Sequence, residues 1–146
     1  MQLFRSTVES VLLYSCEALV ITDTLGNSID ASHRALMRYC LGVHFPDRLS
    51  NDNLYARAKV APATLTLTRN RLRIVGHAIR RPELPLSIIL HPNNQATEAY
   101  RRGGALRRTY LAQLIGDLNA INLTIKDAFR VAQNRTKWQR LVGSVK

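Results

Sequence analysis

Residues 62–81 read PATLTLTRNRLRIVGHAIRR, and this stretch predicts the long helix around which the fold is organised. With about 100° of rotation per residue, one stripe of such a helix carries most of its apolar side chains. The members of the stripe are Leu65, Thr68, Leu72, Val75 and Ile79. Pro62 suits the first turn, and Pro82 ends the helix because proline has no amide hydrogen to donate. The pattern therefore predicts a helix from Pro62 to about Arg81 with one buried face.

Arginines lie beside the apolar stripe of this predicted helix. Arg69, Arg73 and Arg80 fall within about 40° of one another, so the helix can bury its stripe and present three guanidinium groups outward. Gly76 flanks them. Glycine inside a helix costs roughly 1 kcal/mol relative to alanine, so Gly76 indicates that a packed helix or a ligand comes close to the backbone. We expect six side chains of this helix to contact nucleic acid: Arg69, Arg71, Arg73, His77, Arg80 and Arg81.

The rest of the first half also predicts helices. Residues 2–21 carry apolar side chains at helical spacing, which predicts one amphipathic helix. Thr22 to Thr24 offer an N-cap for a second helix, and Gly42 suits the left-handed residue after its C-cap. Ser50 caps a short third helix. Since no stretch alternates with a period of two, the sequence predicts an all-α fold, a small bundle of about five to six helices.

The second half begins with a less regular stretch. Residues 82–108 are rich in proline and glycine, which predicts a basic, loop-rich connection with a short apolar piece at 86–90. Residues 109–146 return to helical spacing, and Thr124 with Asp127 makes a capping-box-like helix start. The chain is thus predicted to have three segments: a helical segment at 1–81, the basic connecting segment at 82–108 and a C-terminal helical segment at 109–146.

Charge is concentrated in the second half of the chain. Residues 1–68 hold six basic and six acidic side chains, whereas residues 69–146 hold fifteen basic and four acidic ones, so the whole net charge of +11 lies after residue 68. Nine of the fifteen are arginines between Arg69 and Arg108, and the guanidinium fork suits phosphate groups and base edges. A field of this strength attracts polyanions, which predicts a nucleic-acid partner. The alternative is a basic face that serves solubility alone.

A second group of arginines lies in the predicted connection: Arg101, Arg102, Arg107 and Arg108. We expect them to make a second, looser contact with nucleic acid. Tyr100 and Tyr110 bracket the group, and their rings could either stack on bases or pack at the ends of helices. Trp138 is followed by Leu141 and Val142 on the same helical side, so we expect its indole to anchor packing and not to stack on bases.

Several kinds of chemistry lack the residues that they need. Cys16 and Cys40 form no C-x-x-C motif, so no metal site is predicted and buried thiols are expected. The carboxylates are isolated along the chain, and no nucleophile lies in a recognisable motif. The apolar run at 8–21 contains Glu9 and Glu17 and is too short to span a bilayer. We therefore expect an intracellular protein, nuclear or cytoplasmic, with no metal, no membrane contact and no catalysis of its own.

Residues 3–18, LFRSTVESVLLYSCEA, are the first of five pieces of the chain that together match one known pattern. They resemble the stretch L-x-x-x-V-x-x-x-L-L-Y-G-x-E-x-W of non-LTR retrotransposon reverse transcriptases, with Ser15 in place of the glycine. The strongest match is residues 71–81, RLRIVGHAIRR, which are similar to the family's R-L-R-x-x-G-H-x-x-R segment. The other pieces are 38–43 (RYCLGV) with 47–55 (DRLSNDNLY), 107–110 (RRTY) and 134–142 (NRTKWQRLV). The resemblance runs nearly end to end.

In that family the matched stretch lies at the end of the thumb, after the polymerase core. The resemblance implies a nucleic-acid-binding C-terminal fragment of an RNA-directed DNA polymerase, with residues 1–81 as a thumb-end-like segment. Its partners would be RNA and/or DNA and the missing polymerase core. The catalytic aspartates of that core are expected upstream of Met1, and Mg²⁺ would be the cofactor of the full-length polymerase. The chain would then need no cofactor and would be inactive alone. The alternative is a non-enzymatic helical interaction or structural protein with an adventitious basic tail.

Overall fold

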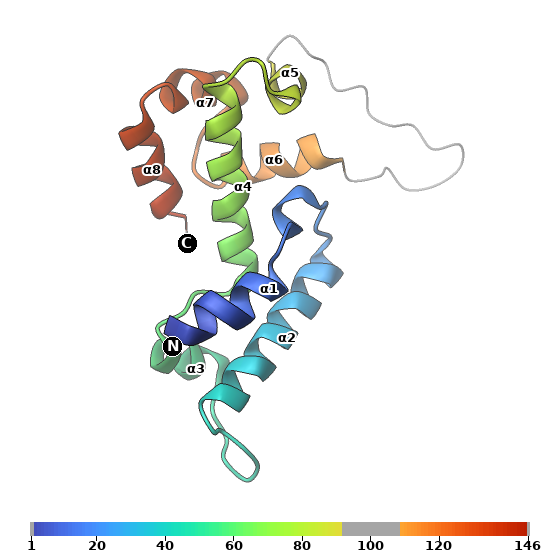
Figure 1. The fold of residues 1–146 in the computed structure, drawn as a ribbon, viewed down its shortest axis with the longest axis vertical. Helices are drawn as coiled ribbons and strands as arrows, with labels where there is room; N and C mark the ends of the chain where they lie inside the picture. Colours follow the sequence, from blue (N-terminus) through green and yellow to red (C-terminus); the bar gives the residue numbers. More distant parts are fainter. Residues whose placement is uncertain (1, 92–108, 146) are drawn as a thin grey trace, which may run out of the picture. The chain divides into compact units, whose positions relative to one another are not determined.

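The computed structural model describes residues 2–91 and 109–145, and every regular element in them is helical (Figure 1). The elements are the π-helical turn η1 (Phe4–Glu9), α1 (Ser10–Leu12), the 3₁₀ turn η2 (Cys16–Ala18), α2 (Asp23–Cys40), α3 (Asn51–Ala58), α4 (Ala63–Ile79), α5 (Pro85–Leu90), α6 (Tyr110–Asn119), α7 (Ile125–Ala132) and α8 (Arg135–Gly143). The all-α prediction is confirmed. The described residues hold eight α-helices instead of five to six, because residues 85–90 form a helix of their own and residues 109–145 form three helices, α6, α7 and α8.

The described chain divides into two compact units, and the division falls inside α4. Met1–Glu17 and Ile21–Leu67 make up the first unit, and Ala18–Val20 and Thr68–Lys146 make up the second. The beginning of α4 therefore packs in the first unit, and the rest of this helix packs in the second. Among the described helices, none is long and apolar enough to cross a membrane.

The prediction of one helix over residues 2–21 is wrong in its second half. Helical backbone continues through η1 and α1 only to Leu12, and Ser15 then takes a left-handed conformation with φ of 56°. Hydroxyl groups compete with the backbone at the start of the segment, where Thr7 Oγ1 donates to the carbonyl of Leu3 at 2.6 Å. Such side-chain bonds bend helices, which is consistent with the wide π-helical turn found here.

Side-chain caps begin the next helices where the sequence predicts them. Thr22 Oγ1 accepts a hydrogen bond from the backbone N–H of Leu25 at the start of α2, and Ser50 Oγ accepts one from Asn53 at the start of α3. At the other end of α2, Gly42 has φ of 66°, as expected for the residue after the C-cap. Each cap satisfies a backbone group that the helix leaves unpaired and contributes about 1 kcal/mol.

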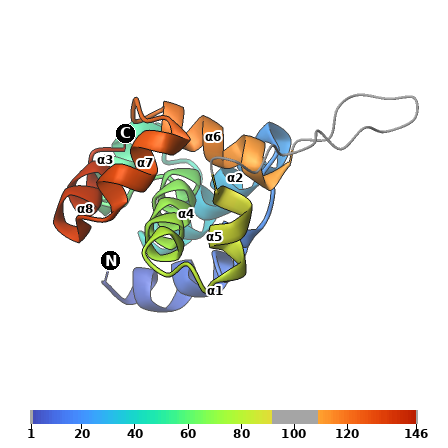
Figure 2. The ribbon, with the colours of Figure 1, turned by 90° about the horizontal axis from the view of Figure 1, so that it is seen from above.

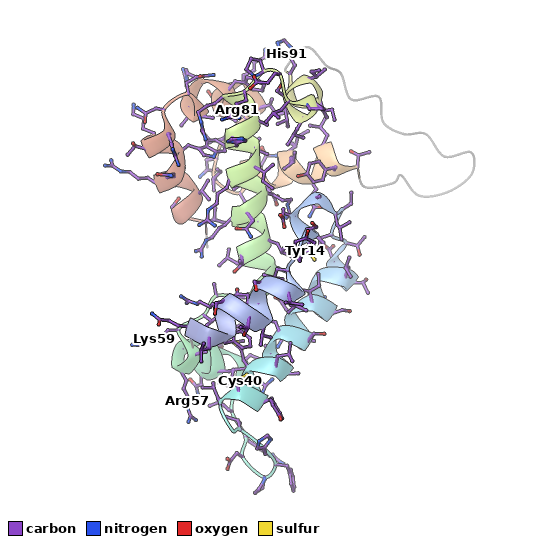
Figure 3. All side chains as sticks on the ribbon, in the orientation of Figure 1. Tyr14, Cys40, Arg57, Lys59, Arg81 and His91 are labelled. Carbon is purple, nitrogen blue, oxygen red and sulfur yellow. The ribbon has the colours of Figure 1, made fainter. Side chains whose placement is uncertain are left out.

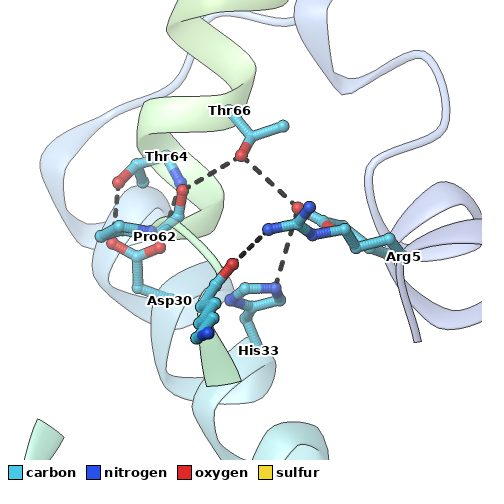
Figure 4. Close-up of polar contacts among 8 residues, drawn as sticks. Arg5, Asp30, His33, Pro62, Thr64 and Thr66 are labelled. Atoms are coloured by element: carbon cyan, nitrogen blue, oxygen red, sulfur yellow. Dashed lines mark hydrogen bonds and ion pairs between the residues drawn. The ribbon is translucent and has the colours of Figure 1, made fainter. Parts of the chain in front are cut away.

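In the first unit, η1 and α3 pack against α2. The core between them consists of Phe4, Met37, Leu54, Ala58 and Val60, and a second cluster consists of Leu13, Ala63 and Leu67. Asp30 on α2 accepts hydrogen bonds from the backbone N–H of Thr64 at 3.0 Å and from its hydroxyl at 2.8 Å (Figure 4). Because Thr64 lies in the first turn of α4, this carboxylate caps α4 from a neighbouring helix.

His33 is a buried member of the same unit. Its ring lies between those of Phe4 and Tyr55, with centroid distances of 5.5 and 6.4 Å. Glu9 Oε1 lies 4.0 Å from Nε2 (Figure 4). Burial lowers the pKa of His33 below its ordinary value, and the nearby carboxylates of Glu9 and Asp30 act in the opposite direction. The imidazole is therefore neutral at pH 7 and serves as a core side chain.

In the second unit, α8 packs along α4 and runs antiparallel to it (Figures 1 and 2). Trp138 on α8 is 2% exposed, and its indole N–H donates to the carbonyl of Leu72 at 2.9 Å. A Cβ atom at Gly76 would lie 2.1 Å from Nε1 of this indole, so only glycine fits there. The prediction that Trp138 anchors packing is confirmed, and of the two explanations for Gly76 the packed helix is correct.

The remaining helices of the second unit are α5, α6 and α7. Residues 86–90, predicted as an apolar piece of a connection, belong to α5, which has Pro85 in its first turn. α6 packs against α7, and α7 packs against α8. Thr124 begins α7 by accepting a hydrogen bond from the backbone N–H of Asp127 at 3.2 Å, which confirms the predicted helix start.

The two cysteines are free and belong to the first unit. Cys16 is half-buried, whereas Cys40, the last residue of α2, is exposed (Figure 3). The expectation of buried thiols is therefore wrong for Cys40.

Candidate nucleic-acid interface

The second unit carries the excess positive charge of the described residues. Residues 68–91 and 109–145 hold ten lysines and arginines and three carboxylates, a net charge of +7, whereas the first unit holds six basic and six acidic side chains. Exposed cations without a carboxylate partner are the most accessible to a polyanion. The position of each arginine in the second unit therefore decides what this charge can bind.

Arg71 points inward, which corrects the expectation that it contacts nucleic acid. Its side chain is 3% exposed, its Nε donates to Asp117 Oδ2 at 2.7 Å, and its Nη2 donates to Oδ1 at 3.3 Å. The helix turns by about 200° between Arg69 and Arg71, so the two residues face opposite sides of α4. The bidentate ion pair joins α4 to α6, and Arg71 is a structural residue.

Arg69 and Arg80 connect α4 to the chain that packs beside it. Arg69 Nη2 donates to the carbonyl of Val145 at 2.8 Å, and Arg80 Nη1 donates to the carbonyl of Ala132, the last residue of α7, at 2.9 Å. Both side chains are half-buried. Their arc adjoins Gly76, against which α8 packs. Two of the three arginines predicted to point outward therefore hold the helices of the unit together.

Arg73, His77 and Arg81 are the exposed ionisable groups of α4 and of the turn that follows it. Arg73 and His77 are four residues apart, so they lie on the same side of the helix. Arg73 Nη1 donates to Asn70 Oδ1 at 2.9 Å, a bond within α4. Arg81 lies where α4 ends, and Figure 3 labels it there.

Further exposed cations, which the sequence-based expectation missed, lie on α7 and α8: Lys126, Arg130, Arg135, Lys137 and Arg140. Arg130 pairs with Asp127, with Nη2 3.0 Å from Oδ1. The hydrogen bond from Thr124, with Arg130 as a smaller cause, holds the pKa of Asp127 below its usual value. A signal for Lys137 and Arg140 was present in the sequence, because Trp138 and Val142 mark the buried side of α8 and these two cations lie about 100° or more away from it.

The name cationic surface is used for the exposed basic and histidine side chains of α4, α7, α8 and the turn after α4 that have no carboxylate partner among the described residues: Arg73, His77, Arg81, Lys126, Arg135, Lys137 and Arg140. In the part of the chain that the structure describes, none of the seven takes part in an ion pair. The helices that carry most of them, α4 and α8, are direct neighbours. Exposed lysines and arginines contact phosphate groups without reading sequence, and the guanidinium forks among them also suit base edges.

The second group of predicted site residues, Arg101, Arg102, Arg107 and Arg108, lies outside the described residues, and so does Tyr100. Tyr110 is the first residue of α6 and is half-buried, which favours packing at the end of a helix over stacking on bases.

Within residues 2–91 and 109–145, no three His, Cys, Asp or Glu side chains lie close enough to hold a metal ion. Two carboxylates of the second unit are engaged in the contacts described above, Asp117 with Arg71 and Asp127 with Thr124 and Arg130. The described geometry thus provides exposed cations and engaged carboxylates. No protein-family model, curated protein or solved structure matches this chain.

Proposed function

We propose that this chain binds RNA or DNA through the cationic surface of its second unit, as the C-terminal segment of a retrotransposon-type reverse transcriptase. The observation that carries the proposal is the exposure of six lysines and arginines that form no ion pair among the described residues, on a unit with a net charge of +7. Such contacts bind the phosphate backbone and release its counterions without reading sequence. The segment holds template, primer or target and leaves catalysis to a polymerase core.

The construction of the second unit supports this role. Arg69, Arg80 and Trp138 each donate a hydrogen bond to a backbone carbonyl and so fix α8 and the end of α7 on α4. The exposed cations consequently lie mostly on helices that are held in place and not on free loops. Preorganised side chains lose less conformational entropy when a ligand binds.

Two backbone positions support the retrotransposon part of the proposal. Ser15 has φ of 56°, a conformation that favours glycine, and the resembling family has glycine at this position. Gly76, in the best-matching piece at 71–81, contacts Trp138, which lies in the matching piece at 134–142. Two separate pieces of the resemblance thus meet in one packing contact. We place this function inside the cell, in the nucleus or cytoplasm, and the two free cysteines suit a reducing compartment.

The test measures binding of the full chain to unrelated RNA and DNA oligonucleotides of equal length over a range of salt concentrations. The variant Arg73→Gln/Arg81→Gln should weaken binding by a similar factor for every sequence and reduce the slope of log K against log salt by up to about two units. The control Arg57→Gln/Lys59→Gln removes two exposed cations of the first unit and the same charge (Figure 3 labels Arg57, Lys59 and Arg81). Equal effects of both variants, or no binding at low salt, would contradict the proposal.

A second candidate function, a structural or interaction protein, is favoured by exposed apolar side chains near the N-terminus. Leu3, Val11 and Tyr14 are 79%, 78% and 81% exposed. Side chains of this kind suit a protein partner, and a polymerase core would be one. The same salt titration separates the two functions, because an interaction protein of this kind would show no steep salt dependence with nucleic acid.

A further inference from the structure

Three aromatic rings are exposed around the loop that joins α2 to α3 in the first unit. Phe45 is 95% exposed, Tyr39 in the last turn of α2 is 76% exposed, and His44 is exposed beside them. The rings of Tyr39 and His44 meet edge to face, with centroids 6.2 Å apart. The loop, residues 41–50, extends beyond the ends of α2 and α3 (Figure 1). Exposed aromatic rings of this size are removed from water when a ligand covers them, and this burial favours binding. The aromatic loop is therefore a candidate binding site.

Hydrogen bonds hold the aromatic loop in shape. The backbone N–H of Asp47 donates to the carbonyl of His44 at 2.8 Å and closes a turn that contains Phe45. Arg38 Nη2 donates to Asn51 Oδ1 at 2.8 Å and so links the two ends of the loop. The rings are therefore presented on an ordered turn, which reduces the entropy lost on binding.

We propose that Tyr39, His44 and Phe45 form a stacking platform for unpaired bases of single-stranded nucleic acid. The inference rests on the proposed function, which brings RNA or DNA to the chain, and it adds the class of nucleic acid that is bound. Aromatic rings stack on any base, because every base has a π face, and only unpaired bases offer that face freely. The exposed neighbours Asp47 and Arg48 cancel in charge, so recognition at the loop comes from the rings and not from phosphate attraction.

The test uses the full chain with two probes, oligothymidine and an abasic oligomer of the same length, which keeps the sugar-phosphate backbone and lacks bases. The wild-type chain should bind oligothymidine more tightly than the abasic oligomer. Phe45→Ala and Tyr39→Ala should each weaken binding of oligothymidine about tenfold and leave binding of the abasic oligomer and the salt slope unchanged. Phe45→Trp should retain the wild-type affinity, because its ring also stacks.

Val11→Ala is the matched control, since it removes an equally exposed apolar side chain of the same unit outside the loop, and it should change nothing. Equal losses on both oligomers, or wild-type affinity in Phe45→Ala with its helicity intact, would overturn the platform. Binding to phosphatidylserine vesicles that Phe45→Ala abolishes, with oligothymidine binding unchanged, would assign the loop to a lipid surface and also overturn it. Absence of any nucleic-acid binding at low salt would overturn the proposed function together with the platform. If all probes bind with a steep salt dependence and the loop variants bind them as tightly as the wild type does, the platform alone would be overturned.

Discussion

The indole of Trp138 lies directly against the backbone of α4 because residue 76 has no side chain. This contact buries the only tryptophan of the chain, and the indole N–H, a donor that needs a partner once buried, bonds to the carbonyl of Leu72 at 2.9 Å. Truncation of a buried aromatic side chain of this size costs about 3–5 kcal/mol. The single glycine in α4 thus decides how closely α8 can approach, and with it where the cations of α8 lie.

Gly76→Ala should lower the free energy of unfolding by about 1–3 kcal/mol, because a methyl group would overlap the indole ring and force α8 to move. Gly116→Ala in α6 is the matched control, since nothing lies within 4 Å of the added Cβ there. That variant should stabilise the protein by up to about 1 kcal/mol through the better helix propensity of alanine. Chemical denaturation measures the free energy of unfolding of both variants. If it changes in the same direction in both, overlap with the indole is not the reason why residue 76 is glycine.

The arginines of α4 show which parts of a site the sequence could predict. Periodicity placed Arg69, Arg73 and Arg80 in one arc, but it could not say what that arc faces, because α8 comes from a distant part of the chain. The structural role of Arg71 was missed for the same reason, since its partner Asp117 lies on α6. A guanidinium group serves a phosphate and a buried carboxylate equally well, so only the packing of α4 separates the two uses.

At the scale of elements, local signals were reliable and spacing alone was not. The caps at Thr22, Ser50 and Thr124 depend on residues three positions away, and all three are confirmed. The break after Leu12 was not predicted, because apolar residues continue at helical spacing through the left-handed residue Ser15. A helix can end without any loss of hydrophobic pattern when the next turn packs in another direction.

Ser15→Gly should stabilise the first unit by about 0.5–1 kcal/mol, since glycine takes a left-handed backbone without the Cβ clash that other residues suffer. The gain is reduced by the larger conformational entropy that glycine loses on folding. Ser15→Ala is the control that separates backbone conformation from loss of the hydroxyl, because alanine keeps the clash, and it should bring no gain. A thermal melt in which Ser15→Ala stabilises as much as Ser15→Gly would show that φ at residue 15 is not strained.

At the scale of the whole molecule, the two units differ in net charge and in the kind of side chain that they expose. The first unit is neutral and exposes aromatic rings, and the second carries a net charge of +7 in its described residues and exposes cations. The sequence predicted the location of the charge, because charge can be counted along a chain. The sequence could not show which arginines are structural and which are exposed, because that depends on which helices become neighbours.

Two sets of substitutions in the second unit should therefore have opposite effects. Arg69→Gln/Arg80→Gln removes the bonds to the carbonyls of Val145 and Ala132 and should lower the free energy of unfolding by about 1.5 kcal/mol for each bond. Arg135→Gln/Lys137→Gln/Arg140→Gln removes only exposed charges, so the free energy of unfolding should change by less than about 0.5 kcal/mol per residue.

Binding should follow the opposite order. The α8 variant should reduce the slope of log K against log salt by about two to three units. The Arg69/Arg80 variant should show nearly the wild-type slope when binding is measured for the molecules that remain folded. Denaturation and salt titration on the same samples give both quantities. If the Arg69/Arg80 variant were as stable as the wild type and lost the salt dependence, these arginines would face nucleic acid after all. The packing of α8 on α4 would then have to be different from the one described, because the same two guanidinium groups cannot serve the carbonyls and the phosphates at once.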